Sequence, residues 1–295
     1  MPRPRRQPDA TVTIDGRSVR AYEGETILTT ATSAGIPVPT LCYVEGLSVW
    51  GGCRVCVVEV AGEQPLRLAF ATPVVDEMDV TVTSDRLVEY RRQIVELLFA
   101  EGNHICSVCV SNGACELQDL AVVVGADHIR FPYQFPARRS RPAARSAEPG
   151  SADFHDRGVD HTHPQFGLDH NRCILCSRCL RVCDEIEGAH VWEIASRGSD
   201  SYVAAELGRP WGESTSCTSC GKCVAVCPTG ALFTKGVGVG EMRHDVAVVD
   251  FLETARETGE WVERSPARAP DRSPTHPPRS SARPDDLLGR SGDQP

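Results

Sequence analysis

The first part of the chain alternates short apolar runs with turn residues, as a small β-sheet would. Residues 11–22 form two runs rich in β-branched residues around Asp15-Gly16, a pattern that predicts a β-hairpin. Residues 26–34 predict a short helix that ends at Gly35. Further strands are predicted where apolar and β-branched residues cluster again, at 55–60, 66–71 and 80–82.

Apolar residues recur at helical spacing in three later segments. Ser84 offers an N-cap to a helix that continues to Gly102, with a packing face made by Leu87, Tyr90, Ile94, Leu97 and Leu98. A second helix is predicted over 116–124 and ends at Gly125. A third is marked by Met242, Val246, Val249, Leu252 and Ala255. A small hairpin is predicted from apolar runs around a polar turn, at 191–194, 197–201 and 202–204.

Three stretches lack the apolar residues that would order them. Residues 137–163 are rich in Arg, Pro, Ser, Ala and Gly and predict a flexible linker. A flexible N-terminus is expected at 1–9 and a disordered tail at 263–295. The linker contains three histidines that we expect to be solvated loop residues rather than metal ligands: His155, His161 and His163.

Charge and hydropathy argue against nucleic-acid-binding, secreted and membrane-spanning proteins. The 295 residues carry a formal net charge of −9, which argues against nucleic acid as a partner. The first residues are charged, but no apolar core follows them, so a secretory signal is not expected. No apolar run approaches the roughly 18 residues of a membrane helix. These features predict a cytoplasmic protein with no membrane span.

Cysteine spacing carries the strongest chemical signal in the chain. Eight of its 14 cysteines form two copies of C-x2-C-x2-C-x3-C, the run that holds a cubane 4Fe-4S cluster. Three thiolates spaced two residues apart can wrap one cluster, while the fourth points away toward the other cluster. The predicted ligand sets are Cys173, Cys176, Cys179 and Cys227 for one cubane, and Cys217, Cys220, Cys223 and Cys183 for its partner. Zinc is the alternative, but it takes two separated pairs of ligands, whereas each copy here is a quartet.

A histidine and three cysteines form a third group of candidate ligands. The stretch from His104 to Cys115 resembles the 4Fe-4S motif of the iron-sulfur subunits of respiratory complex I and related hydrogenases. The resemblance implies a cluster held by His104, Cys106, Cys109 and Cys115, with its potential raised by the neutral imidazole. A lone histidine is usually an ordinary core or surface residue, but three cysteines would leave a cubane without its fourth ligand. Only Ile105 separates the histidine from the first cysteine, as in the hydrogenase-associated branch, whereas complex I normally has three residues there.

The remaining three cysteines lie in the first part of the chain. Cys42, Cys53 and Cys56 have two adjacent glycines, Gly51 and Gly52, between them, which allow the backbone to approach an inorganic core closely. With the predicted hairpin, helix and strands, this arrangement resembles the β-grasp 2Fe-2S ferredoxin domain. That family has the spacing C-x10-C-x2-C-x13-C, and the first three positions match.

The fourth position of that motif is Phe70, which cannot bind iron. Three interpretations stay open for this 2Fe-2S site. A substitute oxygen ligand could complete it, or a cluster could bind weakly through three thiolates, or the site could be empty in a purely structural domain. The candidate oxygen ligands are Thr72, Asp76 and water.

The order of these sites resembles one known family. Together with DHIRFPYQFP, LDHNRCILCSRCLRVCDEIEGAHVW and PWGESTSCTSCGKCVAVCPTGA, the motifs look like the diaphorase electron-transfer subunit of bidirectional, NAD-linked nickel-iron hydrogenases. That subunit is related to the N-terminal part of the large iron-sulfur subunit of complex I. The resemblance implies an α+β chain of three domains. A β-grasp 2Fe-2S ferredoxin-like domain is expected at 10–83, and a small helical 4Fe-4S domain with one histidine and three cysteine ligands at 84–136. A bacterial-type 2x(4Fe-4S) ferredoxin domain with a C-terminal helix is expected at 164–262.

The same resemblance implies an electron relay with three 4Fe-4S clusters and no catalytic site of its own. No constellation of residues suits flavin, nicotinamide or nickel, so the expected partners are a flavin- and NAD-binding diaphorase subunit and the nickel-iron hydrogenase small subunit. One alternative is the equivalent relay subunit of an NADH:quinone oxidoreductase or of an NAD-linked formate dehydrogenase. An alternative of another class is a metal-stabilised scaffold without a redox role.

Overall fold

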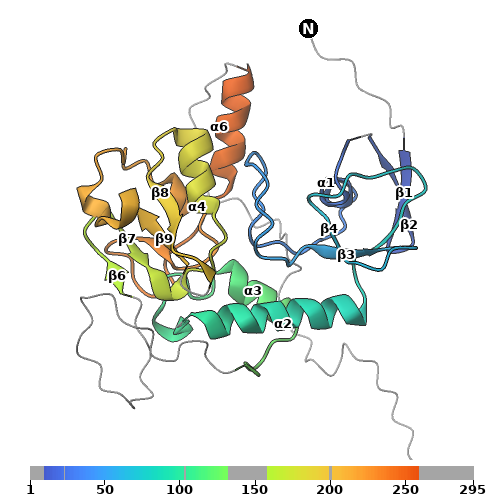
Figure 1. Ribbon diagram of the computed structural model, residues 1–295, viewed down its shortest axis with the longest axis horizontal. Coiled ribbons are helices and arrows are strands. Elements are labelled where there is room, and N and C mark those ends of the chain that lie inside the picture. The colour runs from blue at the N-terminus through green and yellow to red at the C-terminus, as the bar shows by residue number, and fades with distance from the viewer. Residues whose placement is uncertain (1–9, 23, 103, 132–157, 199–200, 259–295) are drawn as a thin grey trace, which may run out of the picture.

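The structure is a computed structural model that describes residues 10–22, 24–102, 104–131, 158–198 and 201–258. An N-terminal and a C-terminal unit, each with its own sheet, lie side by side, and a long helix runs beneath both (Figure 1). Several predictions fall outside these residues and are not tested by them: the flexible N-terminus, the disordered tail, the linker up to residue 157, and part of the turn at 197–201.

The N-terminal unit is built on a mixed five-stranded sheet with the order β2-β1-β5-β3-β4. Its strands are β1 (Ala10–Ile14), β2 (Arg17–Ala21), β3 (Val57–Val60), β4 (Arg67–Leu68) and β5 (Asp79–Thr81). β1 and β2 form the predicted hairpin, with Val12 opposite Val19. Its turn residues, Asp15 and Gly16, both have the positive φ angles that a tight two-residue turn requires.

Helix α1 (Ile27–Ser33) covers this sheet and matches the predicted helix. A reciprocal capping box starts it, because the Thr29 N–H donates to Thr26 Oγ1 at 3.2 Å and the Thr26 N–H donates to Thr29 Oγ1 at 3.0 Å. Its apolar face packs into one core with the strands, through Ile27, Leu28 and Ala31. The helix and sheet together set the position of the cysteine loop between α1 and β3.

The strand predicted at 66–71 is wrong beyond Leu68. The backbone N–H groups of Ala71 and Thr72 both donate to the Leu68 carbonyl at 3.0 Å, which turns the chain back toward α1. Phe70 therefore lies in a tight turn rather than in a strand. Its side chain is only 4% exposed and belongs to the core of the N-terminal unit.

Helix α2 (Asp85–Glu101) begins at Ser84, whose hydroxyl accepts a hydrogen bond from the Leu87 N–H at 3.2 Å, as predicted. Its buried face differs from the predicted one, because Leu97 is 42% exposed. The buried face carries two charged residues, Arg91 and Glu96, each of which finds hydrogen-bond partners. Arg91 donates to three backbone carbonyls, those of Val55, Val57 and Val82.

The C-terminal unit contains a two-stranded and a three-stranded sheet. β8 (Trp192–Ala195) and β9 (Tyr202–Ala205) form the predicted hairpin, and the order of the other sheet is β10-β7-β6. That sheet consists of β6 (Val159–Asp160), β7 (Phe166–Asp169) and β10 (Leu232–Thr234). Two short helices, α4 (Arg178–Arg181) and α5 (Lys222–Ala225), pack against each other, and a π-helical turn, Val182–Glu187, continues α4.

Part of the predicted linker is folded. Val159 and Asp160 form β6, and His163 is only 3% exposed, so the expectation of a solvated loop is wrong for this histidine. His161 is exposed, as expected, and His155 lies outside the described residues. The ring of His163 packs between aromatic side chains, which the composition of the segment could not reveal.

The two remaining α-helices of the described residues are α3 and α6. α3 (Glu116–Val123) agrees with the prediction and packs on α2. α6 (Ala247–Thr258) starts later than predicted, because the Met242 N–H bonds the Val110 carbonyl at 3.0 Å instead of starting a helix. Among the described residues, no helix is both long and apolar enough to cross a membrane.

Candidate iron-sulfur sites

The cysteines predicted for the first cubane line one cavity between α4, the turn after α5, and the strands β7, β9 and β10. Cys173 and Cys176 lie on the loop before α4, Cys179 lies within α4, and Cys227 follows α5. Leu175 and Ser177 have positive φ angles of 52° and 57°. The loop is therefore coiled tightly, and it turns its thiols toward a shared space.

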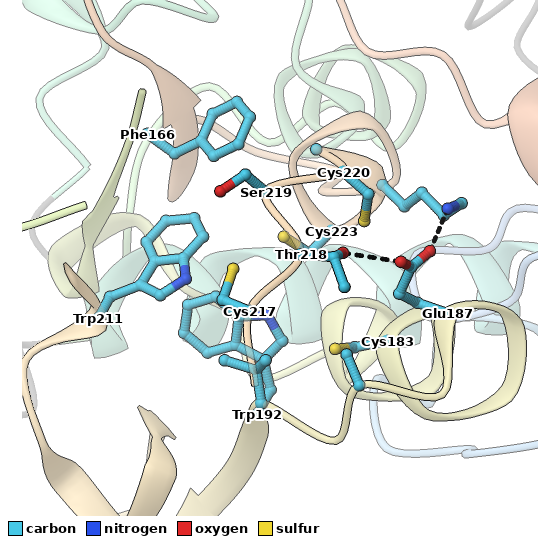
Figure 2. Close-up of a pocket in the computed structure, with 14 residues that line it drawn as sticks. Phe166, Cys183, Glu187, Trp192, Trp211, Cys217, Thr218, Ser219, Cys220 and Cys223 are labelled. Carbon is cyan, nitrogen blue, oxygen red and sulfur yellow. Dashed lines mark hydrogen bonds and ion pairs between the residues drawn. The ribbon is translucent and has the colours of Figure 1, made fainter. Parts of the chain in front are cut away.

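A second cavity is lined by the cysteines predicted for the partner cubane (Figure 2). Cys217, Cys220 and Cys223 approach it from the loop and first turn of α5, and Cys183 comes from the π-helical turn after α4. The figure shows two tryptophans on one side and Glu187 on the other. Cys179 and Cys183 lie four residues apart, as do Cys223 and Cys227, so α4 with its π-helical turn, and α5 with the turn after it, each contribute to both cavities.

The third cavity lies between α2, α3 and the turn after α5, and it is lined by His104, Cys106, Cys109 and Cys115. Phe99 meets the His104 ring edge-on, with ring centroids 5.3 Å apart. Gly230 keeps this space open, because a Cβ there would lie 2.4 Å from Cys109 Sγ. A Cβ on Gly102 would lie 2.4 Å from the Asn171 carbonyl oxygen and 2.8 Å from His104 Nε2.

The three cavities are small and similar in size. Within the described part of the chain, no three histidine, cysteine or acidic side chains converge closely enough to hold a single metal ion. The ligands of each quartet instead surround a space. A zinc ion needs all of its ligands at one point, whereas each ligand of a cubane binds a different iron atom.

Burial makes several of these thiols weaker acids than usual. It raises the pKa of Cys176 and of Cys115 to about 12, and the pKa of Cys179 lies well above its ordinary value because of burial and then of the neighbouring thiols. Such groups become thiolates when a bound metal supplies positive charge. These sets of mostly buried sulfur ligands therefore fit the chemistry of iron-sulfur clusters.

Arg178 adds a fixed positive charge beside the first cavity. Its side chain is 2% exposed, and Cys176 and Cys227 lie close enough for their thiolates to favour the charged form of the guanidinium. Its Nη1 also donates to the Val226 carbonyl at 3.3 Å. Predictions from the spacing of the cysteines alone missed this residue. The position of Arg178 between Cys176 and Cys179 is the sequence feature that could have indicated it.

The site of Cys42, Cys53 and Cys56 differs from the other three. The Cys53 thiol donates to Cys42 Sγ at 3.3 Å, which lowers the pKa of Cys42 to about 6, while burial raises the pKa of Cys56 to about 11. The Phe70 ring faces the cysteine loop, since its Cζ lies 3.1 Å from the place of a Cβ on Gly51.

Asp76, one of the candidate oxygen ligands, already has a hydrogen-bond partner. Asp76 is exposed, and its Oδ1 accepts a hydrogen bond from the Thr11 N–H at 2.8 Å, which holds it against β1. Thr72 is partly buried, and its carbonyl accepts from the Ile27 N–H at 3.0 Å. The residues present supply three thiols and an aromatic ring, which do not fit the four-ligand pattern of a 2Fe-2S cluster.

Three family models match the chain in succession. They are the 2Fe-2S iron-sulfur cluster binding domain over 7–85, the NADH-ubiquinone oxidoreductase-G iron-sulfur binding region over 91–130, and the NADH-quinone oxidoreductase subunit 3, ferredoxin-like domain over 164–233. The HoxS gamma chain of the NAD-reducing hydrogenase of Cupriavidus necator is 32% identical over 81% of this chain and 94% of that protein. This chain belongs to the family of NAD-reducing hydrogenase gamma chains. The family resemblance and the α+β fold predicted from the motifs are thus confirmed.

One solved structure and two longer proteins are also similar to this chain. A chain in the crystal structure of an NAD+-reducing [NiFe]-hydrogenase in the H2-reduced state is 34% identical, with a TM-score of 0.66, and the match covers 78% of this chain and 89% of that one. The NADP-reducing hydrogenase subunit HndD of Solidesulfovibrio fructosivorans is 37% identical over 75% of this chain. The NADH-ubiquinone oxidoreductase 75 kDa subunit of Reclinomonas americana is 30% identical over 76%. The chain spans only 35% and 29% of these two longer proteins.

Proposed function

We propose that this homologue of the hydrogenase gamma chain is an electron relay that holds three 4Fe-4S clusters. The single observation that carries the proposal is that each predicted ligand quartet lines one cavity. The ligand sets are Cys173, Cys176, Cys179 and Cys227; Cys217, Cys220, Cys223 and Cys183; and His104, Cys106, Cys109 and Cys115. When bound, such clusters supply one-electron redox chemistry.

The arrangement of the cavities supports a relay because they are neighbours in a row. Thr229 lines both the His104 cavity and the Cys173 cavity. The Cys173 and Cys217 cavities take ligands from the same two segments, since Cys179 and Cys183 lie four residues apart in one, and Cys223 and Cys227 lie four residues apart in the other. The chain's own part is to fix this spacing and to keep the sites buried.

The chain also ties the Cys42 site to the row. Arg181 donates from Nη2 to the Cys42 carbonyl and from Nη1 to the Ser48 carbonyl, each at 2.5 Å. Glu185 accepts from the Ser48 N–H at 2.7 Å. The proposed relay does not pass through the Cys42 site, since that site lacks a fourth thiol.

The partners and the domain limits belong to the same proposal. We propose a flavin- and NAD-binding diaphorase subunit on one side and the small subunit of a nickel-iron hydrogenase on the other, in the cytoplasm. The proposed domains are 10–83 for the β-grasp unit, 84–136 for the unit with one histidine ligand, and 164–262 for the paired-cubane unit. Membership in a hydrogenase subunit family supports the choice of partners.

Anaerobic purification of the full chain tests the proposal. We expect brown protein whose iron and sulfide are reduced by dithionite and then give low-temperature EPR signals. Protein that is colourless, or that contains only zinc or iron that dithionite leaves unchanged, would overturn the relay and favour the metal-stabilised scaffold.

A pull-down from the native cells under anaerobic conditions tests the partners. Recovery of subunits that contain nickel and flavin is the expected result. Recovery of a quinone-linked complex would instead favour the equivalent subunit of an NADH:quinone oxidoreductase, a class that the relative from Reclinomonas americana represents.

A further inference from the structure

His163 is buried beside the Cys217 cavity although it lies in a segment of linker-like composition. Its ring stacks on Phe166, with ring centroids 5.0 Å apart and planes 21° apart. Trp211 lies on it with a centroid distance of 4.6 Å. Both aromatic residues line the cavity, and Figure 2 shows them on the side of Cys217, away from Glu187. These contacts hold the imidazole in one orientation.

The backbone determines which ring nitrogen carries the proton. The N–H groups of Gln165 and Phe166 both point at His163 Nδ1, each at 3.2 Å. Two donors at Nδ1 require a lone pair there, so the neutral ring carries its hydrogen on Nε2.

The Nε2–H group faces the candidate cluster ligands. Nε2 lies 3.8 Å from Cys217 Sγ and 3.2 Å from Ser219 Oγ. Ser219 and Cys217 both line the cavity, so Nε2 lies next to two residues of its lining. A sulfur acceptor normally lies farther from its donor than an oxygen acceptor, because sulfur is larger.

We propose that His163 is a positioning residue that raises the reduction potential of the cluster held by Cys183, Cys217, Cys220 and Cys223, by donating its Nε2–H to Cys217 Sγ. The inference rests on the proposed ligand set. A hydrogen bond to a ligating sulfur withdraws electron density from it. The reduced cluster, which carries one more negative charge, is therefore stabilised more than the oxidised one.

Two substitutions separate the hydrogen bond from the aromatic stacking. His163→Phe keeps a ring against Trp211 but removes the donor. His163→Gln loses the ring but can place an amide N–H near the position of Nε2. His161→Phe is the matched control, because His161 is exposed and two residues away.

The measurement is an anaerobic redox titration of the full chain followed by low-temperature EPR. The signal altered by Cys220→Ser identifies the cluster concerned. We expect His163→Phe to shift the midpoint potential of that signal to a more negative value. His163→Gln should stay near the wild-type value, and neither variant should move the other signals. Unchanged signals from the other clusters also show that a variant is folded.

Each alternative result has a distinct meaning. If the wild type gives no iron-sulfur signal, the relay itself fails. If the signal is present but His163→Phe leaves its potential unchanged, only the role of His163 fails. Equal negative shifts in His163→Phe and His163→Gln would assign the effect to ring packing, and an equal shift in His161→Phe would show that it is not specific. Both results would overturn the inference.

Discussion

Arg178 and Glu116 form a two-pronged ion pair, in which Nη1 donates to Oε1 at 2.6 Å and Nη2 donates to Oε2 at 2.8 Å. Glu116 directly follows Cys115 of the His104 cavity, and Arg178 lies between Cys176 and Cys179 of the neighbouring cavity. The pair therefore joins two candidate cluster sites that are far apart in the sequence. Planar guanidinium and carboxylate groups match in this geometry, so the pair also fixes the relative orientation of α3 and α4.

Glu116→Ala should destabilise the protein by roughly 2 to 3 kcal/mol. The substitution leaves the guanidinium buried without its carboxylate, and breaking a buried pair costs about 3 to 5 kcal/mol, reduced here because the Glu116 side chain is 29% exposed. The apparent thermal midpoint of the anaerobic protein is the measurement. Adding Arg178→Met to Glu116→Ala should recover part of the loss.

Glu63→Ala is the control for this experiment. It removes an ion pair with Arg67 in which both side chains are exposed, so the midpoint should change little. If Glu116→Ala and Glu63→Ala lower the thermal midpoint equally, the burial of Arg178 does not add to the destabilisation.

Phe70→Cys should complete the ligand set of the Cys42 site. The Phe70 backbone donates a hydrogen bond to the Cys56 sulfur, so a thiol at this position starts close to the other three. We expect about two more iron atoms per chain than in the wild type and an additional two-iron EPR signal. Phe70→Ser tests whether removing the ring is sufficient. If iron content and spectra of the wild type and Phe70→Cys are the same, the fourth position does not limit this site.

Gly230→Ala should damage the His104 site selectively. The added methyl group would lie 2.4 Å from Cys109 Sγ, much closer than van der Waals contact allows. We expect loss or alteration of one four-iron EPR signal, with the loss of up to about four iron atoms per chain. Gly238→Ala is the control, because its added methyl group would meet only the end of the flexible Glu241 side chain. An unaltered spectrum of Gly230→Ala would contradict the assignment of this site.

Acidification should destabilise the protein partly through His244. Its Nδ1 donates to the Val224 carbonyl at 3.1 Å, and its Nε2 accepts from the Ser111 hydroxyl at 3.0 Å. Burial is the main cause that lowers the pKa of His244 below its ordinary 6.5. The hydrogen bond to the Val224 carbonyl and the charge of Glu116 oppose this shift, and Arg178 adds to it. Below about pH 6.5 the unfolded chain binds a proton that the folded chain resists, so stability falls as pH decreases, by at most about 1.4 kcal/mol per pH unit.

The test compares the apparent thermal midpoints of wild type and His244→Gln between pH 7.5 and 5.5. The variant should lose less stability over this interval, since it no longer has this titrating group. Parallel curves for the two proteins would show that His244 does not contribute to the pH dependence.

Local patterns predicted much of this fold, because they depend on residues close together in the chain. The Asp15-Gly16 hairpin needs two adjacent residues with positive φ, and Ser84 caps α2 through a residue three positions away. The predictions failed where distant segments decide what is buried. Arg91 and Glu96 occupy the buried face of α2 because carbonyls of β3 and its flanks, and the side chain of Arg130, supply their partners.

The sequence by itself determined the three kinds of cysteine motif and their order, because ligand spacing is a matter of a few residues of reach. Only the tertiary structure decided what surrounds each thiol. It brought His163 to Cys217 across 54 positions, joined Arg178 to Glu116 across 62, and turned the Phe70 ring toward the cysteine loop. Such contacts arise when separate elements pack together, and periodicity within one element carries no information about them.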